Sequence, residues 1–245
     1  MRMRADTSAT SMTRFVFDPV PVPSLPVLRS QDRVPVRRIF CVGRNYEEHA
    51  KEMGIAVDRE TPFYFTKSPS AVALSGTTIA YPPGTSNYHH EMELVVVIGA
   101  PAFWVEMGAA LSKVYGYCCG LDMTRRDLQL SERAKQRPWD LGKDVEMGAV
   151  LSGVAPAASI GHPQHGRIEL RCNGATRQSA DIAELVWSVP ELIAHLSCFY
   201  HLAPGDLIYT GTPAGVGPVE PGDRLDGSIE GVGEISVVIG APDGG

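Results

Sequence analysis

The chain has 245 residues, of which 44% are hydrophobic and 20% charged, and its net charge at pH 7 is −6. These proportions are ordinary for a globular protein, and the length suffices for one large domain or two small ones with a sizeable core. The acidic balance argues against a nucleic-acid-binding protein, whose contact surface is basic. No apolar stretch approaches the roughly 20 residues that a membrane-spanning helix needs, so no membrane partner is expected.

Five cysteines occur in the chain, at positions Cys41, Cys118, Cys119, Cys172 and Cys198. Their odd number and the lack of C-x-x-C spacing argue against a disulfide framework and against a zinc site. We therefore expect reduced thiols that lie mostly in the core of a cytoplasmic protein. The 25 glycines and 19 prolines indicate many turns and hence a strand-rich fold.

Residues 1–36 are expected to form an N-terminal arm that is partly disordered or extended. Residues 1–13 are polar and lack the apolar stretch of a secretory signal peptide. Several prolines then fall within residues 15–27, and each one disfavours helix in the residue before it. We expect this segment to lie on the domain or on a partner subunit, and the compact domain to cover residues 37–240.

The compact domain begins with RIFCVG at residues 38–43, which predicts a short strand. The following RNYEEHAKEMG predicts a helix that ends at Gly54. On this helix His49 and Glu52 are three residues apart and share one face. A carboxylate can orient an imidazole and support its cation, which would make an acid–base pair, although a surface ion pair has the same spacing.

The segment HHEMELVVVIG, residues 89–99, places two acidic side chains at the start of a predicted buried strand. Glu91 and Glu93 directly precede the apolar run Leu94–Ile98. Residues two apart on a strand point to the same face, so both carboxylates would lie side by side at one edge of the core. Two such anions repel unless a cation compensates them, and oxygen ligands suit Mg²⁺, Mn²⁺ or Ca²⁺. The alternative is a strand end with both charges on its solvated side.

A third carboxylate, Asp122, stands at the end of a strand predicted over residues 115–121. One helix is predicted before this strand, at residues 106–112, and another after it, at residues 123–136. Asp122 could join the two glutamates, but an aspartate in this place also fits the N-cap of the second helix.

Three basic residues occur in the same part of the sequence. Lys67 falls in the turn after a strand predicted over residues 62–71, Arg126 lies one turn into a helix, and Lys143 falls in a polar loop. Each of them, taken alone, is typical of a solvated surface.

The second half of the chain is rich in predicted strands. RIELRCNG, residues 167–174, ends in Asn-Gly, which is a strong hairpin signal. Leu192, Ile193, Leu196 and Phe199 then have the spacing of the core-facing side of a helix.

A strand and a glycine-rich loop occupy residues 204–223. The loop lacks the GK[ST] ending of a nucleotide phosphate loop, and its Pro213 has no amide to donate. Its small residues would let backbone amides and the Thr212 hydroxyl approach a substrate carboxylate, although a plain tight turn explains them equally well.

Five segments occur in an order that resembles the fumarylacetoacetate hydrolase family. They are CVGRNYEEHAKEMG, HHEMELVVVIG, GLDMTRRDLQ, RPWDLGK and GDLIYTGTPAGVGPV. The similarity runs from about residue 37 to residue 238, which is nearly the whole predicted domain. Within the family, GLDMTRRDLQ and RPW are most similar to the corresponding segments of fumarylpyruvate and acylpyruvate hydrolases.

The resemblance implies an α+β, strand-rich fold, in which a mixed β-sandwich roll carries a few peripheral helices, with a catalytic domain over residues 37–240. It implies a divalent metal, Mg²⁺ or else Mn²⁺ or Ca²⁺, bound by Glu91, Glu93 and Asp122. It also implies a homodimer or larger homo-oligomer whose partner is a small diketo acid substrate.

The resemblance assigns catalytic roles to His49, Glu52 and Lys143. It assigns substrate contacts to Arg126, Thr212 and, less securely, Lys67. The implied reaction is hydrolysis of the C–C bond of a 2,4-diketo acid, fumarylpyruvate or another acylpyruvate, to pyruvate and a carboxylic acid.

The chain departs from the family pattern just after Lys143. Val145 stands where an aromatic residue is usual, Glu146 keeps the acid, and Val150 lies near the place of a proline. The family loop lies near the substrate, so substrate choice stays open, and a non-catalytic ligand-binding relative is one alternative.

Two alternatives keep enzymatic activity but change the reaction. An oxaloacetate decarboxylase or a 2-hydroxy-diene-dioate isomerase on the same fold would use the same metal and similar enolate chemistry. A non-haem iron oxygenase, with His89, His90 and Glu91 as ligands, would depend on oxygen instead.

Overall fold

Strand β8 (Met92–Ile98) lies near the centre of the larger of two stacked sheets, and all seven of its residues are buried. Its side chains alternate between two apolar clusters: Leu94 and Val96 join one, and Val95 and Val97 join the other. A strand that is covered on both faces needs an unbroken apolar run, which is why no polar residue occurs from Leu94 to Ile98, after Glu93. The predicted buried strand is confirmed.

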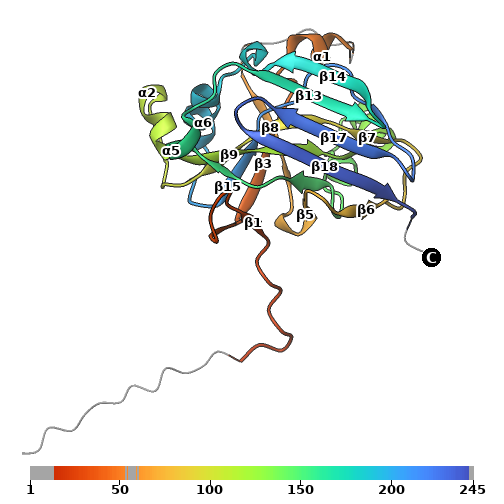
Figure 1. Ribbon diagram of the computed structural model, residues 1–245, viewed down its shortest axis with the longest axis horizontal. Coiled ribbons are helices and arrows are strands. Elements are labelled where there is room, and N and C mark those ends of the chain that lie inside the picture. The colour runs from red at the N-terminus through yellow and green to blue at the C-terminus, as the bar shows by residue number, and fades with distance from the viewer. Residues whose placement is uncertain (1–13, 53, 55–58, 60, 243–245) are drawn as a thin grey trace, which may run out of the picture.

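The larger sheet contains eight strands and lies behind the smaller sheet in the view of Figure 1. Across it the order is β4 (Phe63–Lys67), β3 (Arg38–Gly43), β15 (Asp206–Tyr209), β8, β9 (Val114–Asp122), β11 (Ala149–Leu151) and β5 (Val72–Leu74), with β12 (Ala155–Pro156) paired to β9. The sheet is mixed, because β15 runs parallel to β3 and β11 parallel to β5 whereas the other pairs are antiparallel.

Five strands form the second sheet. Their order is β14 (Ala175–Asp181), β13 (Arg167–Cys172), β17 (Arg224–Ile229), β18 (Gly233–Gly240) and β6 (Thr78–Ala80). Leu170 and Leu225 of this sheet share a core cluster with Leu94 of the larger one, so the two sheets pack face to face. Asn173 and Gly174 connect β13 to β14 with φ angles of 52° and 81°, and this turn confirms the predicted hairpin.

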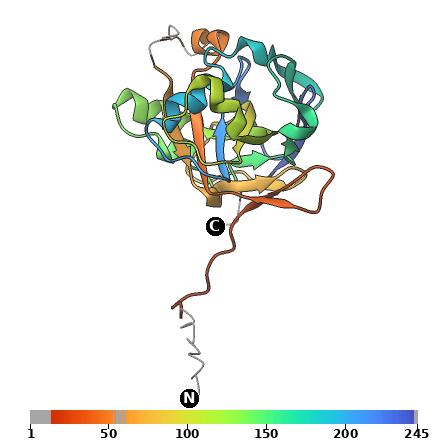
Figure 2. The ribbon, with the colours of Figure 1, turned by 90° about the vertical axis from the view of Figure 1, so that its left-hand side faces the viewer.

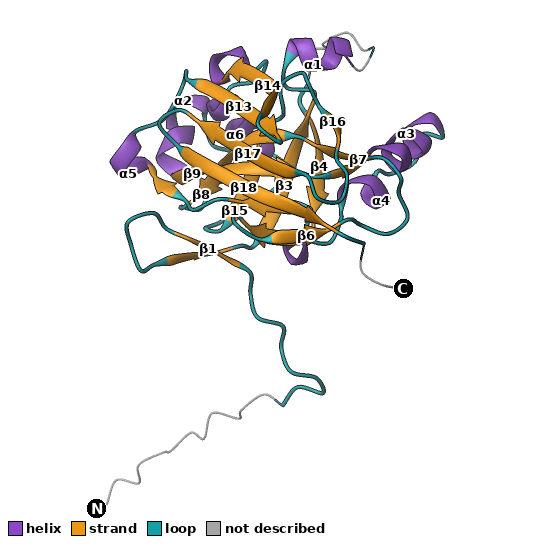
Figure 3. Cartoon of the chain, turned by 45° about the vertical axis from the view of Figure 1, so that its right-hand side comes forward, coloured by secondary structure: helices purple, strands orange, loops and turns teal. Residues whose placement is uncertain are grey.

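Among the described residues, six short α-helices lie around the sheets: α1 (Glu47–Glu52), α2 (Met107–Ala110), α3 (Arg126–Ala134), α4 (Asp140–Lys143), α5 (Ala157–Ile160) and α6 (Val189–Ser197). Figure 3 shows α3 and α4 together on one side of the body and α2 and α5 on the other. Three 3₁₀ turns span Pro69–Ala71, Leu111–Lys113 and Ile182–Glu184. This strand-rich sandwich with peripheral helices confirms the expected fold class. Of the described helices, none is long and apolar enough to cross a membrane.

Two expectations for helices are wrong in detail. Phe199 was expected on the core-facing side of α6, but that helix ends at Ser197 and the Phe199 side chain is 66% exposed. The helix expected from residue 123 starts only at Arg126, because β10 (Thr124–Arg125) first pairs with β7 (Tyr88–His90).

A third, small sheet forms near the ends of β8 and β9. In it β7 is the central strand, flanked by β10 and by β16 (Gly217–Pro218). It joins three segments that are far apart in the sequence and brings the glycine-rich loop beside the start of β8.

The structure describes residues 14–52, 54, 59 and 61–242. Within the expected N-terminal arm, β1 (Ser24–Pro26) pairs with β2 (Arg33–Pro35). Leu25 and Val34 in these strands join the apolar cluster on the outer face of the larger sheet. Residues 14–22 are exposed and run away from the body, as Figures 1 and 2 show.

Candidate metal centre and active site

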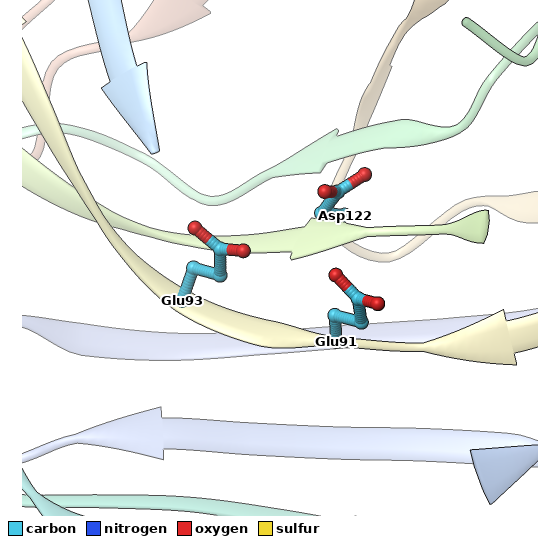
Figure 4. A group of neighbouring side chains, drawn as sticks. All are labelled: Glu91, Glu93 and Asp122. Atoms are coloured by element: carbon cyan, nitrogen blue, oxygen red, sulfur yellow. The ribbon is translucent and has the colours of Figure 1, made fainter. Parts of the chain in front are cut away.

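Three buried carboxylates meet where β7 and β9 end and β8 begins. Glu91 lies between β7 and β8, Glu93 is in β8, and Asp122 is the last residue of β9. The amide of Asp122 donates to the carbonyl of Glu91 (N···O 2.9 Å), which sets these two residues opposite each other on adjacent strands. One oxygen of each carboxylate lies within 4.8 Å of the others, and Figure 4 shows the three side chains converging. These three residues form the carboxylate cluster.

Two cationic side chains neutralise part of this cluster. The Lys143 ammonium lies 2.7 Å from Glu91 Oε2 and 2.7 Å from Asp122 Oδ2, and the Arg126 guanidinium contacts Glu91 Oε1. Burial alone would raise the pKa of Glu91, but the charges of Lys143 and Arg126 outweigh burial and hold that pKa well below its usual range. Glu91 is therefore ionised, with a positive group at each of its oxygens.

Glu93 is the carboxylate without such compensation. The Gly211 amide donates to its Oε2 (2.6 Å), but no cationic side chain in the described part of the chain forms an ion pair with it. Burial raises the pKa of Glu93 well above its ordinary value, and the negative charges of Asp122 and Glu91 raise it further. A bound cation would remove this repulsion.

The donor set of the cluster fits a hard divalent cation. All three ligands offer carboxylate oxygens, which suit Mg²⁺, Mn²⁺ and Ca²⁺. Asp122 Oδ1 is buried and accepts no hydrogen bond, although the Lys67 ammonium lies 2.8 Å away. The cluster thus retains lone pairs that protein groups do not use.

His49 on α1 is paired with Glu52 in the way the sequence predicted. Its Nδ1 lies 3.2 Å from Glu52 Oε2, and the carboxylate of Glu52 also accepts a hydrogen bond from the Gly215 amide (3.2 Å). The histidine is only 7% exposed whereas the Glu52 side chain is 36% exposed, so the pair spans the edge of the buried region with its imidazole inside. An imidazole that donates its Nδ1 proton to a carboxylate keeps Nε2 as a proton acceptor.

One cavity, here called the site cavity, connects the carboxylate cluster with most of the predicted residues. It is lined by Glu91, Glu93, His49, Arg126, Lys143 and Thr212, among others. Asp122, Glu52 and Lys67 do not line it but contact residues that do. Residues from five separate segments therefore face one enclosed space.

Lys67 lies elsewhere than a substrate contact would require. Its ammonium is fully buried behind Asp122, and it donates to the carbonyl of Met123 (3.1 Å) and to the carbonyl of Lys143. In this position it fixes the backbone beside the cluster, because those carbonyls have no water to bind.

Lys143 was expected in a polar loop but ends the short helix α4. This helix packs closely on α3, since a Cβ atom on Gly142 would lie 2.8 Å from the backbone nitrogen of Gln129. Only glycine permits such an approach, and the approach directs the next residue into the cluster. The altered positions that follow lie away from the site cavity: Val145 is in the core, Glu146 is exposed and Val150 is in β11.

The histidines before the cluster do not contribute to it. His89 Nε2 lies 2.8 Å from Asn87 Oδ1, and His90 Nδ1 lies 3.2 Å from Gln178 Oε1. Among the described residues, the only group of metal-ligand type holds no histidine. The alternative of a histidine-ligated iron oxygenase therefore has no support in the structure.

Gln178 of β14 is a buried residue that sequence reasoning missed. Its Oε1 accepts from the Met92 amide (3.0 Å), and its Nε2 donates to Thr212 Oγ1 (2.8 Å) and to the Pro213 carbonyl (2.8 Å). Thr212 in turn donates its hydroxyl proton to the Met92 carbonyl (2.8 Å). Gln178 thus ties the glycine-rich loop to the strand that carries the glutamates. In the sequence, the only feature that could have indicated this role is that Gln178 is a polar residue at an inward-facing position of its strand.

Gln178→Leu is expected to lower kcat/KM about 10- to 100-fold, as is usual when a residue that supports metal ligands is lost. The leucine would leave the Met92 amide and the Pro213 carbonyl without their hydrogen-bond partner, so the free energy of unfolding should also fall by about 1 to 3 kcal/mol. Steady-state kinetics and urea unfolding measure the two effects. Gln164→Leu, at an exposed position, is the matched control and should change neither.

Comparison with known proteins agrees with this geometry. The family model described as fumarylacetoacetate (FAA) hydrolase C-terminal matches residues 38–239. A fumarylpyruvate hydrolase from Ralstonia sp is 56% identical over 190 residues, which cover 77% of this chain and 98% of the relative. The mitochondrial oxaloacetate tautomerase FAHD1 of Homo sapiens is 38% identical over 207 residues, which cover 84% of this chain and 93% of the relative.

A solved structure shows the same fold with ligands. The crystal structure of fumarylpyruvate hydrolase from Pseudomonas aeruginosa in complex with Mn²⁺ and pyruvate has a TM-score of 0.91 and 46% sequence identity. The match covers 93% of this chain and 100% of that one. From the family model, the similar sequences and the shared fold, the chain belongs to the fumarylacetoacetate hydrolase family.

Proposed function

We propose that this chain is a metal-dependent hydrolase that cleaves fumarylpyruvate, or a closely related 2,4-diketo acid, to pyruvate and a carboxylic acid. The observation that carries the proposal is the site cavity, where two glutamates of the buried carboxylate cluster meet the carboxylate-oriented His49 and the Lys143 ammonium. The 56% identity to a fumarylpyruvate hydrolase supports this choice of substrate.

The proposed metal is Mg²⁺ or Mn²⁺, held by Glu91, Glu93 and Asp122. When bound, such an ion supplies Lewis-acid stabilisation of the negative charge that develops on a 2-oxo acid during C–C cleavage. The relative from Pseudomonas aeruginosa was crystallised with Mn²⁺ and pyruvate, and pyruvate is the product proposed here.

His49 acts as the general base in this proposal. Its Nε2 takes a proton from water while Glu52 holds the ring through Nδ1, and the hydroxide attacks the C4 carbonyl. The C3–C4 bond then breaks, the acyl group leaves as a carboxylic acid, and the C3 fragment leaves as the enolate of pyruvate. His49 returns its proton to C3, so that one water is consumed and pyruvate is released.

The cations of the site cavity are proposed to hold the anionic parts of the substrate. Lys143 stabilises the oxyanion formed at C4 through its charge, since its three N–H donors go to Glu91, Asp122 and Thr124, and Arg126 binds the carboxylate of the pyruvyl end. Thr212 shapes the wall beside them, because its hydroxyl proton is already donated to Met92.

Turnover of fumarylpyruvate by the purified protein tests the proposal. We expect hydrolysis with Mg²⁺ or Mn²⁺, a fall of at least about 100-fold after chelation because several kcal/mol of Lewis-acid stabilisation are lost, and recovery when metal is added back. Oxaloacetate is the discriminating second substrate, since relatives with 38% identity are oxaloacetate tautomerases. Metal-dependent tautomerisation of oxaloacetate without hydrolysis of any acylpyruvate would overturn the hydrolase assignment.

A cytoplasmic location and a homodimer or larger homo-oligomer are also part of the proposal. The five cysteines form no disulfide, and four of them are buried, which supports a reducing compartment. Sedimentation velocity and fractionation of the source cell test these two points.

A further inference from the structure

Two arginines line the site cavity in addition to the residues already discussed. Arg44 follows β3 in a left-handed backbone conformation with φ of 59°, and Arg133 lies in the last turn of α3. Both side chains are half-buried. Across the described residues, neither guanidinium forms an ion pair with a carboxylate.

The two guanidinium groups belong to residues that line the same cavity. Burial lowers the pKa of Arg44, and the positive charge of Arg133 lowers it further. Like charges that are held together at a partly enclosed place repel unless an anion lies between them. Two arginine forks also match the planar geometry of a carboxylate better than any other pair of side chains.

Three aromatic side chains, Phe63, Phe65 and Trp139, form a wall of the site cavity that contacts both Lys143 and Arg44. The Lys143 ammonium lies 4.9 Å from the Phe65 ring centre, and Phe65 is 6.3 Å from Trp139. Trp139 meets Phe63 edge to face at 5.2 Å, and the Arg44 guanidinium lies 5.3 Å from the centre of the Phe63 ring. The ring contacts thus lead from Lys143 at one end to Arg44 at the other.

Gly43 makes this arrangement possible. A Cβ atom at this position would lie 2.0 Å from the Phe63 ring, so any other residue would push the ring away from the wall. A flat, conjugated acyl chain fits against such aromatic faces.

We propose that Arg44 and Arg133 bind a second carboxylate at the far end of the substrate. The enzyme would then select 2,4-diketo acids whose acyl group ends in a carboxylate over acylpyruvates with a neutral acyl group, and its second product would be a dicarboxylate. The inference rests on the proposed function, and it adds the two residues that would recognise the carboxylate at the acyl end of fumarylpyruvate.

The test compares two substrates that differ in this second carboxylate, fumarylpyruvate and acetylpyruvate. Arg44→Gln and Arg133→Gln should each lower kcat/KM for fumarylpyruvate about 10- to 100-fold, chiefly through KM, because one charge-assisted contact is lost. Acetylpyruvate turnover should stay within about twofold of the unaltered enzyme, since its methyl group has no charge to bind. Position 44 has a left-handed backbone conformation, and glutamine should adopt it at a free-energy cost similar to that of arginine.

Lys135→Gln is the matched control. It removes the same charge from an exposed position two residues beyond Arg133, outside the site cavity. Because only long-range attraction of the substrate is weakened, kcat/KM should change by less than about threefold. Equal loss on both substrates in Arg44→Gln and Arg133→Gln, or no loss on fumarylpyruvate, would overturn the inference.

Binding separates failure of this inference from failure of the proposed function. Fumarate and crotonate differ only in the second carboxylate, so calorimetric titration of the Mn²⁺-loaded protein measures its contribution without turnover. We expect fumarate to bind at least about tenfold more tightly, and this preference to disappear in Arg133→Gln. A protein that hydrolyses neither substrate but shows this preference would contradict the hydrolase assignment alone. Equal affinity for the two acids would overturn the arginine site.

Discussion

Glu93→Gln is expected to lower kcat by about 10³-fold or more and, at the same time, to stabilise the metal-free protein. The fall in kcat follows because the cluster would keep only two anionic ligands and would bind the metal poorly. The metal is expected to supply several kcal/mol of charge stabilisation during the reaction. The gain follows because Glu93 is buried beside Asp122 and Glu91, and burial together with their charges raises its pKa well above the ordinary value. Glutamine removes this repulsion and can still accept from the Gly211 amide.

Urea unfolding in the presence of a chelator, and Mn²⁺ titration by calorimetry, measure the two sides of this prediction. We expect the free energy of unfolding to rise by about 0.5 to 2 kcal/mol, the size typical of relieving strain at a functional site. Asp122→Asn is the informative comparison. It also removes a ligand, but it leaves the buried Lys67 and Lys143 ammonium groups facing a neutral amide, so it should destabilise by about 3 to 5 kcal/mol. If Glu93→Gln bound Mn²⁺ normally, the ligand assignment would be wrong.

Glu93→Gln and Asp122→Asn are expected to change stability in opposite directions because the cationic side chains pair with only two of the three carboxylates. Lys67, Lys143 and Arg126 together match the charge of the three carboxylates, yet all their ion pairs are with Glu91 and Asp122. A protein selected for stability alone would place a cation at Glu93 too. The uncompensated carboxylate is consistent with a site kept for a metal at some cost in stability.

The sequence was sufficient for the parts of the site that depend on local periodicity. Glu91 and Glu93 could be placed on one face because strand side chains repeat every two residues, and the apolar run after them predicted burial of that strand. His49 and Glu52 could be paired because they lie on one helix face. Asp122 required more, since its N-cap alternative could be removed only by the strand pairing that sets it opposite Glu91.

Other parts depended on contacts between distant segments, which no local pattern encodes. Gln178 bonds to a backbone amide 86 residues earlier, and Lys143 bonds to a carboxylate 52 residues away. Both are ordinary polar residues in the sequence, and only the packing of β14 and α4 gives them their partners. The same holds for Arg44 and Arg133, which the fold brings to one cavity from different elements.

The strand pair within the expected N-terminal arm was missed for a related reason. The prolines before residue 27 correctly indicated extended chain, but Leu25 and Val34 lie between polar or proline neighbours and show no run or period. They are buried because the outer face of the larger sheet is apolar and needs a cover. The short strands β1 and β2 cover this face, and no local sequence pattern predicts them.

His49→Ala is expected to lower kcat by about 10²- to 10⁴-fold, the range that a positioned general base contributes, with Mn²⁺ affinity unchanged. The side chain lines the site cavity, and its one hydrogen-bond partner in the described part of the chain is Glu52, so its removal leaves every contact of the carboxylate cluster in place. Steady-state kinetics with fumarylpyruvate give the loss, and calorimetry gives the metal affinity. The combination separates this substitution from Glu93→Gln, which should lose both properties.

Exogenous imidazole distinguishes a lost base from a distorted site. Imidazole that enters the space left by His49→Ala should restore part of the turnover, because Glu52 stays fixed by the Gly215 amide and can orient the added ring. Glu52→Gln should show a smaller loss, about 10- to 100-fold, since it removes only the group that orients the base, and imidazole should not restore it. His165→Ala, at an exposed position, controls for the loss of a histidine in general. Near-normal turnover by His49→Ala would assign the base to another group, and loss of Mn²⁺ binding in this variant would indicate that His49 supports the metal rather than the water.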